Sequence, residues 1–251
     1  MHATLIGYGE AGQAFDVGGD WRAYDVLPAR SKAASLAEAL DGAGIVLSLV
    51  TADQTLAVAR EAARCLAPGA LYCDMNSVAP GTKHEAAAAI EAAGGRYVDV
   101  AVMAPVNPAR LAVPLLVSGR HVGAALAALA QLGFSKARSV GAEVGKASAI
   151  KMIRSVMVKG VEALSDEMMA AAEAAGVSDD VLAALDASET AMSWTERAAY
   201  NRERMASHGL RRAAEMEDAA RTLAALGVDP VMTRGTILRQ RAAAKAPQES
   251  P

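Results

Sequence analysis

Three glycines near the start of the chain have a spacing suited to phosphate binding. They lie in Gly7-Tyr8-Gly9-Glu10-Ala11-Gly12, directly after a short apolar segment that predicts a buried strand. Gly7 would allow a tight turn, Gly9 the close approach of a pyrophosphate, and Gly12 the close packing of a helix on the strand. The N–H groups of that helix would face the phosphates. The pattern favours a dinucleotide site, although an ordinary glycine-rich turn would have the same composition.

Asp25 follows the next apolar segment, 21–24, about where a ribose-binding carboxylate is needed. A carboxylate there accepts hydrogen bonds from the ribose hydroxyls of NAD and repels the 2′-phosphate of NADP. Arg30 and Lys32 lie close behind it and would instead hold that phosphate, so NADP stays possible beside NAD. The first helix must be short, and Gly18-Gly19 is expected to end it early.

Lys151 is the residue best suited to acid–base chemistry. It lies early in a segment, 146–175, that predicts one long helix. Ser148 and Ser155 share its helical face and Arg154 lies beside it. Ser148 is small, so a substrate would come close to the backbone there. A helix that leaves the sheet beside the dinucleotide would direct this face at its reactive end. The opposing interpretation is a solvated surface lysine, the commonest fate of this residue type.

Strand-like and helical segments alternate along the first 145 residues. Apolar runs of strand length recur at 45–50, 71–74, 97–103, 115–118 and 134–140. This alternation predicts an α/β Rossmann-type domain, with a mostly parallel, doubly wound sheet and helices on both faces. Ligands should gather at the carboxyl ends of the strands, in the loops at 7–12, 50–55, 76–80 and 103–110.

Beyond residue 145 no strand pattern remains. The sequence predicts an all-helical domain at 146–251, with long helices at 146–175 and 197–226 and a final helix to about residue 244. Ser178, and Ser188 or Thr190, are the expected helix caps, and the tail at 246–251 is expected to fray. A cleft between the two domains is the expected binding site.

The helical domain has more apolar surface than one copy is expected to bury. Its methionines include Met157, Met168, Met169 and Met192, among many alanines. Such faces predict a homodimer formed through this domain, and the alternative is ordinary core packing.

Composition narrows the possible partners. The 251 residues are 53% hydrophobic, 21% charged and 4% aromatic, with a net charge of −3. Neither nucleic acid nor an anionic membrane is an expected partner, since there is no basic excess and few rings for stacking. Cys65 and Cys73 lack metal-ligand spacing and suggest reduced thiols in the cytoplasm. A strand at the third residue leaves no room for a signal peptide, and no apolar run is long enough to span a membrane.

Five segments together resemble the β-hydroxyacid dehydrogenase family, which includes 3-hydroxyisobutyrate dehydrogenase and, more distantly, 6-phosphogluconate dehydrogenase. They are GYGEAG at 7–12, AYDVLP at 23–28, DMNSVAP at 74–80, DVAVM at 99–103, and the stretch from Gly145 to Lys151. The resemblance covers nearly the whole chain. The segment 203–216 looks like a branch of this family with an unassigned C-terminal domain.

The resemblance implies a role for each matching position. Lys151 corresponds to the catalytic lysine, the general acid in carbonyl reduction and general base in alcohol oxidation. Ser77 corresponds to a serine or threonine near the nicotinamide and the substrate. Val50 and Thr51 correspond to a loop that runs along the cofactor.

Two departures from the family pattern bear on the substrate. Met103-Ala-Pro105 replaces a Ser-Gly-Gly that holds the substrate carboxylate, and Arg154 replaces an asparagine. Methionine donates no hydrogen bond to a carboxylate, and proline has no N–H. We therefore expect a substrate larger or less polar than 3-hydroxyisobutyrate, with Met103 as an apolar wall and Arg154 as the anion-binding group.

His208 belongs to a polar cluster with Arg211, Arg212 and Glu215 at helical spacing. It is a candidate substrate contact, and a surface ion-pair ladder is the competing interpretation. Trp194 and Tyr200 would shape an aromatic pocket or belong to the core or an interface.

Three functions remain open. The leading one is an NAD(P)-dependent dehydrogenase or reductase that acts on a hydroxy/oxo acid. A second is reduction of a C=N bond; the related imine reductases lack the lysine, which counts against this function. The third is a dinucleotide-binding protein without catalysis. No metal is implied.

Overall fold

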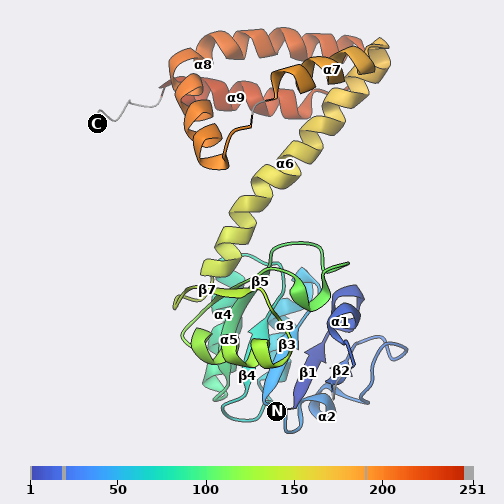
Figure 1. Ribbon diagram of the computed structural model, residues 1–251, viewed down its shortest axis with the longest axis vertical. Helices are drawn as coiled ribbons and strands as arrows, with labels where there is room; N and C mark the ends of the chain where they lie inside the picture. Colours follow the sequence, from blue (N-terminus) through green and yellow to red (C-terminus); the bar gives the residue numbers. More distant parts are fainter. Residues whose placement is uncertain (1, 19–20, 190, 246–251) are drawn as a thin grey trace. The chain divides into compact units, whose positions relative to one another are not determined.

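The computed structural model describes residues 2–18, 21–189 and 191–245 (Figure 1). The predicted tail at 246–251, Gly19 and the candidate cap Thr190 lie outside these residues. The chain forms two compact units, Met1–Ser155 and Val156–Pro251. Helix α6 (Lys146–Ala175) begins in the first unit and continues into the second. The domain boundary was predicted near residue 145, where this helix begins, whereas the two compact units divide within the helix, after Ser155.

The first unit is built on one seven-stranded sheet with the strand order β2-β1-β3-β4-β5-β6-β7. The strands are β1 (Ala3–Ile6), β2 (Trp21–Tyr24), β3 (Ile45–Ser48), β4 (Leu71–Asp74), β5 (Arg96–Val102), β6 (Leu115–Ser118) and β7 (Ala137–Gly141). All neighbours pair in parallel except β5 and β6, which are antiparallel. The predicted fold class, a mostly parallel Rossmann-type sheet followed by helices, is confirmed.

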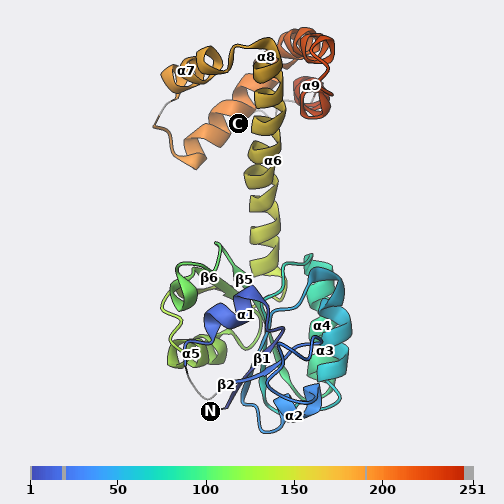
Figure 2. The same cartoon turned by 90° about the vertical axis from the view of Figure 1, so that its right-hand side faces the viewer.

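Helices cover both faces of this sheet (Figure 2). One face carries α1 (Glu10–Phe15) and α5 (Val122–Gln131), and the other carries α2 (Leu36–Leu40), α3 (Thr55–Ala62) and α4 (Pro80–Ala92). Because both faces are covered, β1, β3, β4 and β6 are buried at every position. This burial explains why these strands read as continuous apolar runs.

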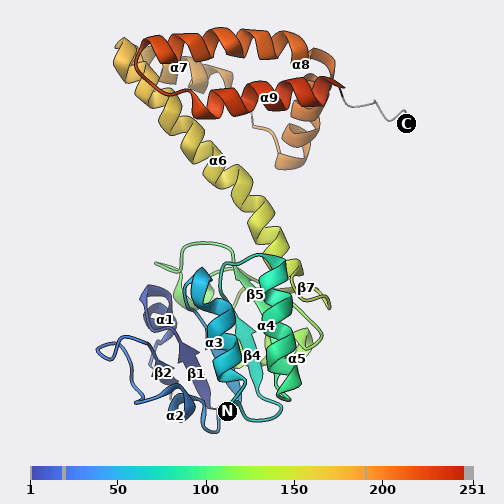
Figure 3. The same ribbon diagram turned by 180° about the vertical axis from the view of Figure 1, so that it is seen from behind.

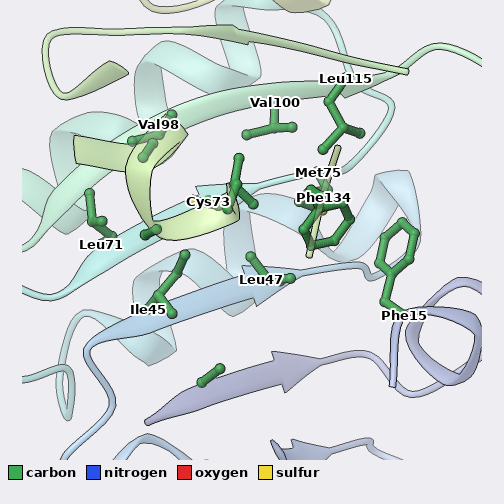
Figure 4. Close-up of a cluster of buried hydrophobic side chains, with 14 of the residues drawn as sticks. Phe15, Ile45, Leu47, Leu71, Cys73, Met75, Val98, Val100, Leu115 and Phe134 are labelled. Carbon is green, nitrogen blue, oxygen red and sulfur yellow. The ribbon is translucent and has the colours of Figure 1, made fainter. Parts of the chain in front are cut away.

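Figure 4 shows the core on the α1 and α5 side, where Leu47, Cys73 and Val100 of neighbouring strands meet Phe15 and Phe134. The two phenylalanine rings pack edge to face, 5.0 Å apart. Phe134 was expected to open the last strand. It lies instead in the turn before β7, because its ring is needed in this core.

The first helix ends earlier than its glycines suggested. α1 stops at Phe15, and Asp16 takes the capping position before Gly18. Phe15 is fully buried, so the chain must turn there to bring β2 back alongside β1.

The second unit is entirely helical within its described residues. After α6 come α7 (Ser178–Ser188), α8 (Trp194–Ala225) and α9 (Val231–Lys245), and α8 and α9 lie side by side (Figure 3). Two predicted caps are wrong. Ser178 is the first residue of α7 rather than its cap, and Ser188 is the last residue of α7 rather than the cap of the next helix. The cap of α8 is Ser193, which forms a reciprocal capping box with Glu196.

Gly209 allows α8 and α9 to pack closely. A Cβ atom there would lie 2.4 Å from the carbonyl oxygen of Gln240, so only glycine fits. Glu167 of α6 fixes the start of α9: its carboxylate accepts N–H groups from Met232 (2.6 Å) and Thr233 (2.9 Å), and the Thr233 hydroxyl (2.6 Å). A buried carboxylate thus caps the positive end of a helix. Within the described residues, no helix has the length and apolarity needed to cross a membrane.

Candidate functional site

The glycine-rich turn is shaped by three different constraints. Gly7 has φ +87°, and a Cβ atom there would lie 2.5 Å from the carbonyl oxygen of Leu49. A Cβ atom at Gly12 would lie 2.4 Å from the carbonyl oxygen of Gly7. At Gly9 the nearest atom is an Arg30 guanidinium nitrogen at 3.9 Å, so the protein itself does not crowd this position. The turn therefore fits a pyrophosphate, because it is open only where a phosphate must approach the backbone.

Asp25 directly follows β2, and its carboxylate contacts the glycine-rich turn. One carboxylate oxygen accepts the backbone N–H of Tyr8 at 2.8 Å, and the other accepts that of Leu27 at 2.9 Å. These bonds leave acceptor capacity on both oxygens. A pocket of about 380 Å³ opens beside the carboxylate, lined by Tyr24, Asp25, Val26, Pro28, Ser31, Lys32, Ala33 and Ala34. The hydroxyls of an adenosine ribose in this pocket could donate hydrogen bonds to Asp25.

Of the two basic residues near Asp25, Lys32 is already paired with another carboxylate. Lys32 forms an ion pair with Asp16 and lies 4.9 Å from the centre of the Tyr8 ring, while the Tyr8 hydroxyl donates to Asp16 at 2.6 Å. Burial raises the pKa of Asp16, but the hydrogen bonds from Lys32 and Tyr8 outweigh it and hold this pKa below its ordinary value. The hydrogen bond to Asp16 raises the pKa of Lys32. Arg30 is exposed and its side chain has no hydrogen bond or ion pair with other described residues.

A second pocket, of about 260 Å³, lies where the strands end, and Lys151 belongs to it. Its lining is Ala11, Leu49, Val50, Ala52, Met75, Asn76, Ser77, Val102, Val106 and Lys151, all from the first unit. The Lys151 amine donates a hydrogen bond to the Ser77 hydroxyl at 2.5 Å. The structure thus brings together the two residues predicted for acid–base chemistry and nicotinamide contact. Ala11 and Val50 connect this pocket to the glycine-rich turn.

Asn76 is a pocket residue that the sequence did not single out. Its side chain is 4% exposed and donates to the Ser48 hydroxyl at 3.1 Å, and its backbone N–H donates to Asp74 at 3.0 Å. Its side-chain oxygen has no hydrogen-bond partner in the described part of the chain. A buried unpaired acceptor is costly, so Asn76 suits a ligand that donates a hydrogen bond. The only sequence signal was its place beside Ser77 in DMNSVAP.

Two residues predicted for substrate contact lie elsewhere. Met103 packs with Ala101 and Ala147 and is absent from the pocket lining. Because side chains alternate along a strand, Val102 faces the pocket instead, with Val106 beside it. Ser148 is buried, and its hydroxyl donates to Asp99 at 2.6 Å. Its hydroxyl therefore holds the helix on the sheet, and the substrate contact expected at Ser148 stays a prediction.

The remaining predicted residues are exposed. Thr51 precedes a short 3-10 helix, Ala52–Gln54, in the loop that follows β3. Its carbonyl oxygen accepts a hydrogen bond from the Thr55 hydroxyl. Arg154 lies on α6 in the first unit, without a hydrogen bond or ion pair to other described side chains. His208 lies on α8 in the second unit. The roles assigned to these three residues stay predictions.

A buried ionic cluster lies beneath the pocket. The Lys83 amine, which is 0% exposed, donates to the Asp74 carboxylate at 2.8 Å and lies 3.4 Å from that of Asp99. The Tyr97 hydroxyl donates to Asp74 at 2.7 Å, and burial followed by the Asp74 charge raises the pKa of this tyrosine well above its ordinary value. The sequence hinted at the cluster only through the aspartates in or at the end of two apolar strands, 71–74 and 96–102.

The two pockets fit a nicotinamide dinucleotide, and comparison with known proteins identifies the class as an NAD(P)-binding oxidoreductase of the dehydrogenase/reductase type. Residues 21–133 match the NAD binding domain of 6-phosphogluconate dehydrogenase, and residues 172–243 match a domain of unknown function, DUF1932. The chain therefore joins an NAD binding domain of the 6-phosphogluconate dehydrogenase type to a C-terminal DUF1932 domain. The predicted family and the NAD(P) cofactor are confirmed.

Two solved relatives extend over almost the whole chain. A conserved hypothetical protein from Sinorhizobium meliloti 1021 is 37% identical, with a TM-score of 0.62, over 99% of this chain and 90% of its own. Conserved protein MTH1747, described as structurally similar to 3-hydroxyacid dehydrogenases, is 28% identical, with a TM-score of 0.60, over 97% of this chain and 96% of its own.

An imine reductase from Streptomyces aurantiacus shares the fold, with a TM-score of 0.78 at 19% identity, over 96% of this chain and 94% of its own. An uncharacterized 28.5 kDa protein of Methanothermus fervidus is 30% identical over 145 residues, 58% of this chain. The chain covers 54% of the length of that curated relative.

Proposed function

We propose that this protein is an NAD(P)-dependent dehydrogenase or reductase that acts on a hydroxy or oxo acid, with Lys151 as its general acid and base. The observation that carries the proposal is the hydrogen bond from the Lys151 amine to Ser77 inside the pocket at the strand ends. This pocket adjoins the glycine-rich turn, where a dinucleotide's phosphates fit. MTH1747, a relative over most of its length, is described as similar to 3-hydroxyacid dehydrogenases.

In this proposal the chain's residues handle the proton while the bound dinucleotide supplies or accepts the hydride. Lys151 donates a proton to the substrate oxygen as a carbonyl is reduced, and removes it when the alcohol is oxidised. Ser77 holds the amine on the pocket side through its hydroxyl oxygen. Leu49, Val50, Val102 and Val106 exclude water from the reacting carbon, and dry surroundings strengthen each polar contact.

The lining of the pocket supports a substrate larger or less polar than 3-hydroxyisobutyrate. Val102 and Val106 line the part of the pocket that follows β5, where a serine could bind a substrate carboxylate. Neither valine side chain donates a hydrogen bond. Arg154 remains our candidate for binding an acidic group, since its guanidinium is not engaged within the described residues.

The test is a screen of hydroxyacids, aryl-substituted hydroxyacids and amino-alcohol acids, read at the nicotinamide absorbance, with wild-type protein and Lys151→Ala. We expect turnover to fall by about a hundredfold or more in Lys151→Ala, because the proton acceptor is lost, while coenzyme affinity stays within about twofold. Lys159→Ala, on the same helix and exposed, is the matched control. Unchanged turnover in Lys151→Ala would exclude lysine acid–base catalysis.

Reduction of a C=N bond is the second candidate, since imine reductases share the fold. A panel of cyclic imines with NADH and NADPH separates the two candidates. Turnover of imines that persists in Lys151→Ala, together with no oxidation of any hydroxyacid, would favour imine reduction. A protein that binds coenzyme but turns over neither panel would be a dinucleotide-binding protein without catalysis.

A further inference from the structure

We infer that the buried cluster of Lys83, Asp74 and Asp99 positions Lys151 against Ser77. Lys83 is a positioning residue in this scheme: it ties the loop that carries Ser77 to the first turn of the helix that carries Lys151. The inference rests on the proposed role of Lys151, and it adds the device that fixes the amine in the pocket.

One half of the cluster holds the Ser77 loop. Asp74 is the last residue of β4, and its carboxylate accepts the backbone N–H of Asn76 at 3.0 Å and the Tyr97 hydroxyl at 2.7 Å. The Lys83 amine donates to the same carboxylate at 2.8 Å and to the Asp74 carbonyl at 2.7 Å. The chain around Ser77 therefore leaves the sheet in one fixed direction.

The other half holds the start of α6. Asp99 in β5 accepts the backbone N–H of Ser148 at 3.0 Å and its hydroxyl at 2.6 Å. The Ser118 hydroxyl donates to Asp99 at 3.1 Å and accepts the backbone N–H of Ala147 at 3.0 Å. These bonds use the free N–H groups of the first helical turn, and Lys151 follows one turn later on the same face.

Lys83 joins the two halves because its amine reaches both carboxylates. It lies 2.8 Å from Asp74 and 3.4 Å from Asp99, and all three side chains are 0% exposed. Buried charges without partners are costly, so neither carboxylate can shift independently of the amine. The Ser77 loop and the Lys151 helix are thus both held by Lys83, through Asp74 and Asp99. In this inference these buried contacts fix the distance between the side chains of Ser77 and Lys151.

The experiment measures the amine directly, without a substrate. Each lysine is labelled competitively with acetic anhydride at neutral pH, and the extent is read by peptide mass spectrometry, with exposed Lys159 as the internal reference. Ser148→Ala removes one donor to Asp99 and keeps the helix. Thr4→Val is the matched control, because Thr4 is also a buried residue of the first unit whose hydroxyl donates a hydrogen bond, to the carbonyl of Ala39 at 2.7 Å.

We expect the labelling rate of Lys151 relative to Lys159 to change about threefold or more in Ser148→Ala, because the hydrogen bond to Ser77 is disturbed, and to stay unchanged in Thr4→Val. Lys83→Met should change it further. If Lys83→Met does not fold, the labelling rate of Lys151 in Ser148→Ala still tests the inference. Equal Lys151 labelling in wild type, Ser148→Ala and Thr4→Val would overturn the inference, even where thermal stability falls in both variants.

The outcome is separable from that of the proposed function. Should Lys151→Ala retain turnover, the acid–base role fails, while the labelling result still reports where the amine is held. With a substrate from the screen, Ser148→Ala should lower kcat on the order of tenfold while coenzyme affinity is kept, because small displacements of a reacting group are costly. A purely structural role would lower stability and leave kcat of the folded enzyme unchanged.

Discussion

At the scale of single residues, Asp25 and Arg30 have opposite expected effects on coenzyme preference. Asp25 lines the pocket that we assign to the adenosine ribose, and the Arg30 guanidinium lies near Gly9 without an ion-pair partner among the described residues. A carboxylate favours the ribose hydroxyls, whereas a guanidinium favours a 2′-phosphate. We propose that Asp25 prevails and that NADH binds more tightly than NADPH.

A fluorescence titration with both coenzymes tests this preference. Asp25→Asn keeps an acceptor for the Tyr8 N–H but removes the charge. It should shift the NADPH/NADH affinity ratio toward NADPH about tenfold or more, the factor expected for a hydrogen bond to a charged group. Arg60→Ala, on the surface of α3, should leave the ratio unchanged. Tighter binding of NADPH than of NADH by the wild-type protein would contradict the proposed preference for NAD.

At the scale of elements, the seating of α9 depends on one carboxylate. Burial raises the pKa of Glu167, but the hydrogen bonds from Thr233 and from the backbone of Met232 and Thr233 outweigh it and hold this pKa below its ordinary value. A carboxyl group whose folded-state pKa is depressed stabilises the protein above its unfolded-state pKa. That contribution is lost as the pH falls through the lower, folded-state value.

Glu167→Gln is therefore expected to destabilise the helical unit by about 1–3 kcal/mol at neutral pH, and less in acid, where the wild type loses the same charge. Thermal unfolding followed by far-UV circular dichroism at neutral and acidic pH measures both effects. Glu162→Gln, exposed on the same helix, is the control. A loss of stability that is equal at both pH values would argue against the ionised carboxylate as the cause.

At the scale of the whole molecule, α6 exposes more apolar surface than a monomer ordinarily tolerates. Ile153 is 73% exposed and Val156 is 76% exposed, and Met157, Val161 and Leu164 are exposed on the same helix. Large exposed apolar patches mark interaction sites. We propose that a second copy of the chain covers this apolar face of the helix, and that the protein is a homodimer.

The double variant Ile153→Asp/Val156→Asp should convert the dimer to monomer, because buried charges without partners oppose association. Light scattering on size-exclusion eluates gives the mass directly. Val17→Asp, an exposed apolar position of the first unit, should leave the mass unchanged. A wild-type protein that is monomeric at micromolar concentration would refute the proposed homodimer.

The amino-acid sequence predicted the elements well where local pattern decides them. The ranges of β2, β6 and α6 agree with the structure. β6 is buried at every position and therefore reads as an apolar run, and a long helix such as α6 requires the absence of proline. Boundaries failed where a distant contact decides them. Phe134 was assigned to a strand but fills the core beside Phe15. The start of α8 was missed for a different reason: Ser193 and Glu196 form a capping box within its first turn, which is a local pattern already present in the sequence.

The sequence by itself determined the fold class, the family, the glycine-rich turn and the candidate pair of Lys151 and Ser77, because these depend on residue type and spacing along the chain. Only the tertiary structure decided which side chains meet across elements. It placed Val102 rather than Met103 in the pocket, buried Ser148 against Asp99, and assembled Lys83 with its two aspartates. The physical reason is that a charge can be buried only where partners from other strands and helices arrive, and spacing along one chain does not reveal those partners.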